Sequence, residues 1–103
     1  MSQTYNREKL SVAVDALVSS NQGIRERLGT ACLSIHMLQP NDFLEVEQQK
    51  YKSLFDKLNS VEPIGDEGSF QATLNAMTIE EAGERAREIL HLYIQVELLT
   101  HGQ

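Results

Sequence analysis

The chain of 103 residues has one cysteine, two prolines, no tryptophan and no long uncharged apolar run. Because Cys32 is alone, it cannot form an intramolecular disulfide or a metal site built on paired cysteines. The first residues, MSQTYNREKL, are polar and lack the apolar stretch of a signal peptide. No segment reaches the roughly 18 uncharged apolar residues typical of a membrane-spanning helix. We therefore expect a cytoplasmic protein that does not contact membranes.

Positive charge is also scarce, and the formal net charge is −6. The acids concentrate after residue 40, where twelve acidic side chains accompany five basic ones. Such a surface repels phosphates at long range. We therefore expect no direct binding of nucleic acid.

Alternation of the kind found in β-strands is absent over any useful length, and apolar residues instead recur at spacings of three and four. The sequence therefore predicts an all-α fold, and because the connections between these stretches are short, neighbouring helices are expected to be antiparallel. The expected arrangement is an antiparallel four-helix bundle with one additional short helix before the C-terminal helix, and residues 1–103 form a single domain. The four main helices are expected over residues 5–20, 24–39, about 43–58 and 78–100, and the short one over 70–77.

The C-terminal helix has the longest periodic pattern and is expected to organise the core. Thr78 and Glu81 have the spacing of a capping box at its start, and Asp42 and Glu45 have the same spacing before the third helix. One apolar stripe is formed by residues three or four positions apart: Ile79, Ala82, Ala86, Ile89, Tyr93 and Val96.

Further apolar residues widen this stripe beyond what one neighbouring helix covers. Leu90 contributes to this widening, and a contact surface is predicted from Leu92, Ile94, Leu98 and Leu99. Apolar surface left exposed in a monomer usually marks a site of protein contact. We therefore expect a protein partner or a homodimer.

Residues 59–68, NSVEPIGDEG, form the one substantial loop. Asp66 and Glu67 lie between glycines near the start of the short helix, where turn formation and negative charge are both favourable. The same two acids could instead form a tip that binds a partner.

Arg85 and His91 are the candidate catalytic residues. Their spacing resembles the R-x4-6-H signature of HEPN-domain ribonucleases, in which arginine and histidine from a dimer converge on the scissile phosphate. The resemblance implies metal-independent cleavage of RNA by Arg85 and His91. Alternatively, Arg85 belongs to an exposed ladder with Glu81, Glu84 and Glu88, whose members contact each other at spacings of three or four residues.

Other constellations are incomplete. Glu88 and His91 have the Glu-x-x-His spacing of dinuclear metal sites, but the pair occurs once instead of twice. Cys32 and His36 are one turn apart, yet no acid or amide is identifiable that would orient the histidine, so an inert buried cysteine is expected. We expect no metal and no cofactor.

The sequence therefore favours a small acidic protein-interaction module without catalytic activity: an adaptor, a regulator or a small subunit of a larger assembly. The two alternatives are the HEPN-like ribonuclease and an acidic inhibitor whose carboxylates mimic nucleic-acid phosphates. The acids expected to serve in such an inhibitor are Asp42, Glu45, Glu47, Glu62, Asp66 and Glu67.

Overall fold

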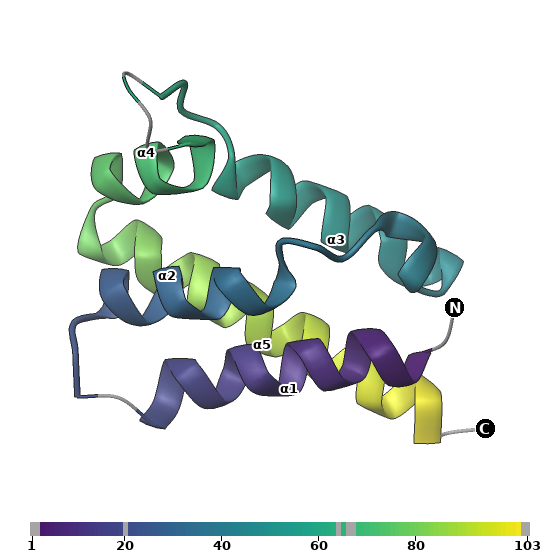
Figure 1. Cartoon of the computed structure of the whole chain (residues 1–103). Coiled ribbons are helices and arrows are strands. Elements are labelled where there is room, and N and C mark those ends of the chain that lie inside the picture. The colour runs from purple at the N-terminus through teal and green to yellow at the C-terminus, as the bar shows by residue number, and fades with distance from the viewer. Residues whose placement is uncertain (1–2, 20, 64, 66–67, 102–103) are drawn as a thin grey trace.

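A computed structural model describes residues 3–19, 21–63, 65 and 68–101. These residues form five α-helices and one 3-10 turn, and they contain no strand (Figure 1). The elements are α1 (Gln3–Ser19), α2 (Ile24–Ile35), the turn η1 (Pro40–Asp42), α3 (Glu45–Leu58), α4 (Gly68–Ala76) and α5 (Ile79–His101). The predicted all-α fold class is confirmed.

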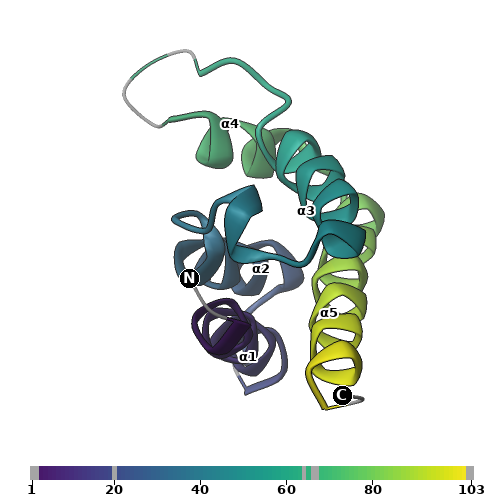
Figure 2. The same cartoon turned by 90° about the vertical axis from the view of Figure 1, so that its right-hand side faces the viewer.

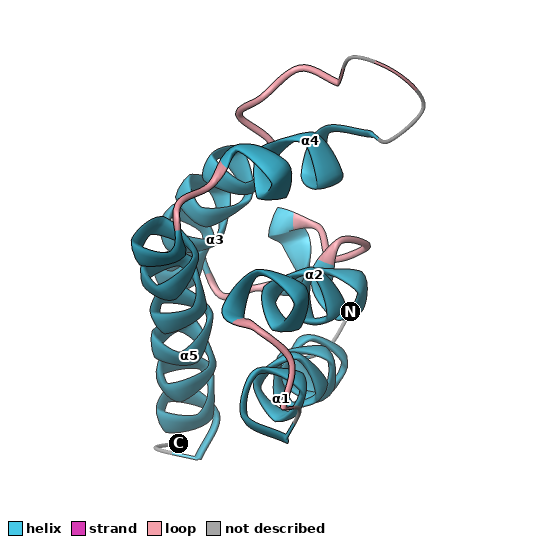
Figure 3. Ribbon diagram, turned by 90° about the vertical axis from the view of Figure 1, so that its left-hand side faces the viewer, coloured by secondary structure: helices cyan, strands magenta, loops and turns pink. Residues whose placement is uncertain are grey.

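Helix α5 contacts α1, α2 and α3. Helices α1 and α2 pack against each other on one side of α5, and α3 lies along α5 beside them (Figures 2 and 3). The short helix α4 packs on α2 and α3 at one end. The main helices alternate in direction (Figure 1). The predicted four-helix arrangement itself is not confirmed, because α3 packs mainly on α5 and α4.

The core is built on the inward face of α5. Ala82, Ile89, Leu92 and Val96 are fully buried there and pack with the apolar side chains of α1, α2 and α3. The expectation that Leu92 belongs to an exposed surface is wrong, since only 1% of it is exposed. The packing of α1, α2 and α3 against α5 widens its buried arc, so that position 92, about one turn from both Ile89 and Val96, falls within it.

The start of α5 is capped as predicted. The backbone N–H of Glu81 donates to Thr78 Oγ1 at 3.0 Å, and the backbone N–H of Thr78 donates to Glu81 Oε1 at 2.9 Å. Ile79, however, is exposed instead of belonging to the core stripe.

The predicted pairing of Asp42 with Glu45 is wrong. Asp42 Oδ2 instead accepts the backbone N–H of Gln39 at 2.8 Å, which stabilises the 3-10 turn. Glu47, two residues after Glu45, accepts the backbone N–H of Leu44 with its Oε1 at 3.1 Å. A carboxylate therefore does bond back to the residue before α3, but from position 47.

Helix α2 ends at Ile35, four residues before the predicted end. The connection that follows is part of the core, because Leu38 and Phe43 are both buried. Phe43 stacks on Tyr51 with ring centroids 4.5 Å apart, and the Tyr51 hydroxyl donates to the Leu38 carbonyl at 2.6 Å. These contacts attach the connection to α3.

Gly29 lies inside α2, where a glycine costs helix stability relative to alanine. A Cβ at position 29 would lie 3.3 Å from Leu74 Cδ1, so the group that approaches Gly29 is a side chain of α4. The absence of a side chain at Gly29 therefore lets α4 pack close to α2.

Asn6 and Glu47 are fully buried polar side chains at the entry to α3. Asn6 Nδ2 donates to the Asp42 carbonyl at 2.6 Å, so both side chains bond to the backbone of the same short connection. Asn6 Oδ1 and Glu47 Oε2 have no hydrogen-bond partner among the described protein atoms. Burial raises the pKa of Glu47 above its ordinary value of 4.5, and this effect exceeds the opposing one of the Leu44 N–H.

Replacing Glu47 with glutamine should therefore stabilise the protein at neutral pH, by about 1 kcal/mol. Because the folded-state pKa is raised, the favourable contribution of Glu47 is complete below its unfolded pKa and is lost as pH rises through the folded pKa. The gain of E47Q over wild type in urea unfolding should accordingly be small below pH 4.5 and larger near pH 8.

Glu45 supplies the matched control, because it is an exposed glutamate in the first turn of the same helix. E45Q should lack this gain. If E47Q were less stable than wild type at neutral pH, the hydrogen bond that the carboxylate accepts from Leu44 would stabilise the protein by more than desolvation of the carboxylate destabilises it. That result would contradict the prediction.

Candidate functional site

The predicted catalytic arginine takes part in an ionic cluster that joins α5 to α3. Arg85 Nε and Glu88 Oε1 lie 2.8 Å apart, although the N–H does not point along this line, so the contact is an ion pair. Lys57 Nζ of α3 donates to Glu88 Oε2 at 2.9 Å. Arg85 is also 3.4 Å from Glu84. The predicted ion-pair ladder is therefore present with Glu84 and Glu88.

His91, by contrast, is exposed on another side of α5. Six residues separate it from Arg85, which places the two positions about 120° apart around the helix axis. His91 lines a shallow hollow of about 160 Å³ with Glu88, Lys50, Ser53 and Leu54. Arg85 lines a different hollow, beside Lys57 and Thr73. Within one chain the structure does not bring the two predicted catalytic side chains together.

No group of three or more histidine, cysteine, aspartate or glutamate side chains suited to a metal occurs among the described residues. Glu88 and His91 share the shallow hollow, but Glu88 already binds two cations, Arg85 and Lys57. Glu88 therefore takes part in the contact between α3 and α5.

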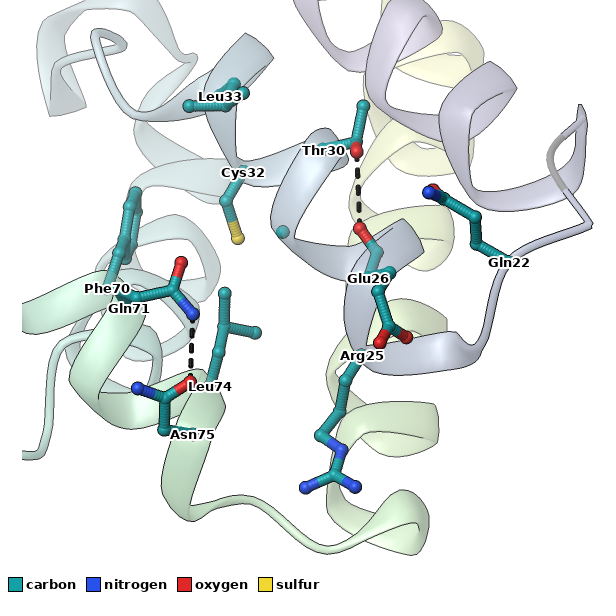
Figure 4. A pocket seen from close by; sticks show the side chains of 11 residues that line it. Gln22, Arg25, Glu26, Thr30, Cys32, Leu33, Phe70, Gln71, Leu74 and Asn75 are labelled. Carbon is teal, nitrogen blue, oxygen red and sulfur yellow. Dashed lines mark hydrogen bonds between the residues drawn. The ribbon is translucent and has the colours of Figure 1, made fainter. Parts of the chain in front are cut away.

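An open groove of about 600 Å³ lies between α2 and α4 (Figure 4). Cys32 and Leu74 point toward each other from the two facing helices, and Phe70 lies beside them. The outer side chains are mostly polar, and Gln71 Nε2 donates to Asn75 Oδ1 at 2.9 Å. The groove is lined by Gln22, Arg25, Glu26, Gly29, Thr30, Cys32, Leu33, Phe70, Gln71, Leu74 and Asn75.

Cys32 in this groove has the properties of an inert thiol. It is almost fully buried, and burial raises its pKa to about 12. His36 is exposed, and its ring packs against the edge of Phe70 with centroids 6.4 Å apart. A thiol that stays protonated at physiological pH is a poor nucleophile. The groove therefore offers shape and polar contacts but no activated nucleophile.

The exposed apolar side of α5 is the remaining candidate site. Leu90, Ile94 and Leu98 are 38%, 43% and 68% exposed, and their i, i+4, i+8 spacing places them along one side of the helix. We call these three residues the outer ridge. Leu90 takes the place predicted for Leu92, and its spacing from Ile94 is the sequence signal that identifies it. Other large exposed apolar side chains lie elsewhere on the surface: Val12, Val18, Leu33, Met37, Val46 and Ile79.

The remaining predicted site residues fall outside what the structure describes. Asp66 and Glu67 lie outside the described residues, and the side chain of Leu99 does too, although its backbone belongs to α5. Their proposed role in partner binding stays a prediction.

No helix among the described residues has both the length and the apolar character needed to cross a membrane. No family model matches the chain, nor does any curated protein or solved structure.

The burial of Cys32 leads to a testable expectation for its reactivity. In the folded protein, alkylation by iodoacetamide should be at least about a hundredfold slower than in the urea-unfolded chain, because it requires local opening. Leu74→Ala should speed the reaction, because Leu74 faces Cys32 from α4. Mass spectrometry of the labelled protein over time measures both rates.

Met37→Ala is the control, since Met37 is exposed and does not line the groove. It should leave the labelling rate unchanged. Labelling of folded wild type as fast as that of the unfolded chain would contradict an inert, covered thiol.

Proposed function

We propose that the chain is a protein-interaction module without catalytic activity, acting as an adaptor, a regulator or a small subunit of a larger assembly. It would make its contact through the outer ridge of α5. The observation that supports the proposal most directly is the exposure of Leu90, Ile94 and Leu98 along one side of the central helix. Three consecutive apolar positions on one helix side match the way in which an amphipathic helix meets a helical or grooved protein surface.

The size of the outer ridge limits the strength of the contact. Complete burial of one large apolar side chain contributes about 1.5–3 kcal/mol, and these three are already partly covered. Association also costs several kcal/mol in lost freedom of motion. The ridge therefore supports a reversible contact, which becomes stronger where charged neighbours such as Arg87 add complementary interactions.

The acidic-inhibitor alternative receives less support. Glu47 is fully buried, so it cannot present its charge to a basic target. Asp42 holds the backbone N–H of Gln39, and Asp66 and Glu67 lie outside the described residues. Of the six acids named for this alternative, Glu45 and Glu62 are described as exposed.

The HEPN-like ribonuclease alternative has no observation of its own in its favour. The positive charge of Arg85 is balanced by Glu84 and Glu88, and His91 lies on a different side of α5. Such a site would have to be assembled from the two chains of a dimer, with Arg85 released from its acidic neighbours.

The proposed contact predicts that crosslinking depends on position. A photo-reactive amino acid placed at Ile94 should trap protein in living cells, whereas the same group at Leu33 should trap much less. The lysine pair L90K/L98K, made beside the probe at position 94, should abolish trapping by placing charge in the contact.

M37K supplies the matched control, because Met37 is exposed to a similar extent as Leu98. It should leave trapping at position 94 unchanged. Equal trapping from positions 33 and 94, or trapping that survives L90K/L98K, would contradict the outer ridge as the contact surface.

A further inference from the structure

The outer ridge and its charged neighbours have a pattern that is complementary to itself. Leu90 and Ile94 lie two residues to either side of position 92, and Arg87 and Glu97 lie five residues to either side of it. At about 100° per residue, these four positions fall within an arc of about 80° on the outward side of α5. An apolar pair is therefore nested inside a pair of opposite charges.

We infer that the outer ridge binds the outer ridge of a second copy of this chain, with the two α5 helices antiparallel and the symmetry axis near position 92. This inference rests on the proposed function, because it names the partner for the same surface. Leu90 of each copy would then face Ile94 of the other, and Arg87 would face Glu97. A two-fold axis produces each contact twice.

The antiparallel direction follows from the charges. In a parallel, in-register pair, Arg87 would face Arg87 and Glu97 would face Glu97, which are repulsive contacts. The antiparallel register converts both into attractive pairs. The spacing of these residues also fits a pair of packed helices. Positions 87, 90, 94 and 97 alternate at spacings of three and four, as the a and d positions of a coiled coil do. In the antiparallel pair, each a position of one helix would face a d position of the other.

Glu97 already contacts Arg7 of α1 at a long distance of 3.8 Å. Both side chains of that pair are partly exposed, so the interaction adds little stability. Arg87 is exposed. Glu84, one turn away from Arg87, is already 3.4 Å from Arg85. Each Glu97 would thus lie between Arg7 of its own chain and Arg87 of the second copy.

Self-association has to overcome the repulsion between two chains that each carry a net charge of −6. Added salt weakens this overall repulsion and the two exposed ion pairs alike, whereas the apolar contact persists. The apolar pairs therefore provide the attraction, and the two charge pairs select the register.

The test uses charge reversal and mixing, with sedimentation velocity as the readout. Wild type should show a reversible monomer–dimer equilibrium. R87E and E97R should each raise the dissociation constant by about tenfold or more, because both charge pairs become repulsive in either homodimer. A mixture of R87E and E97R should form a heterodimer. In it, the acid introduced at position 87 of one chain meets the base introduced at position 97 of the other, and the native Glu97 and Arg87 also meet.

The double variant R87E/E97R should recover the dimer that each single variant weakens, and I94K should be monomeric. Circular dichroism and the unfolding temperature of each variant confirm that the fold is retained, and M37K serves as a control that leaves the dimer unchanged. A monomeric wild type at high concentration would overturn the inference, and so would a mixture of R87E and E97R that recovers no dimer.

The two proposals fail in different ways. If wild type stays monomeric while a probe at Ile94 traps another protein, the contact surface stands and the second copy is excluded as its partner. If neither dimer nor trapping is found, both proposals are wrong.

Discussion

Burial of one side of α5 is the constraint on which the other helices depend. Ala82, Ile89, Leu92 and Val96 are almost completely removed from solvent by the packing of α1, α2 and α3 against α5. The cap formed by Thr78 and Glu81 fixes where this helix begins, and the ion pairs from Glu88 to Arg85 and Lys57 add a polar contact between α5 and α3. Because α5 packs into the core through its inward side, Leu90, Ile94 and Leu98 on the opposite side stay exposed.

Sequence periodicity was sufficient to predict the fold class, the positions of the long helices and the cap at Thr78, because each depends on residues close together in the chain. It failed where distant segments decide the outcome. The end of α2 at Ile35 depends on Leu38 and Phe43 packing beside Tyr51. The burial of Leu92 depends on the helices α1, α2 and α3 that pack against α5. The sequence pattern predicts that Glu47 is exposed, whereas in the structure it is fully buried.

The candidate site was predicted in part. Ile94 and Leu98 are exposed as expected, and Leu90 joins them in place of Leu92. The spacing of Arg85 and His91 suggested a catalytic site, but the two residues lie on different sides of the helix. Arg85 also forms an ion pair with Glu88. Features that depend only on helix rotation were readable from the sequence, whereas features that depend on which charged side chains are already paired required the structure.

The most direct measurement of the central claim is a methyl-group NMR spectrum recorded over a range of protein concentrations. Self-association through the outer ridge should make signals from Leu90, Ile94 and Leu98 shift or broaden as concentration rises, while those of Leu33 and Met37, which are also exposed, stay unchanged. Changes centred on Leu33 and Met37, or none at the outer ridge, would contradict the assignment of α5 as the surface through which this chain meets a second copy.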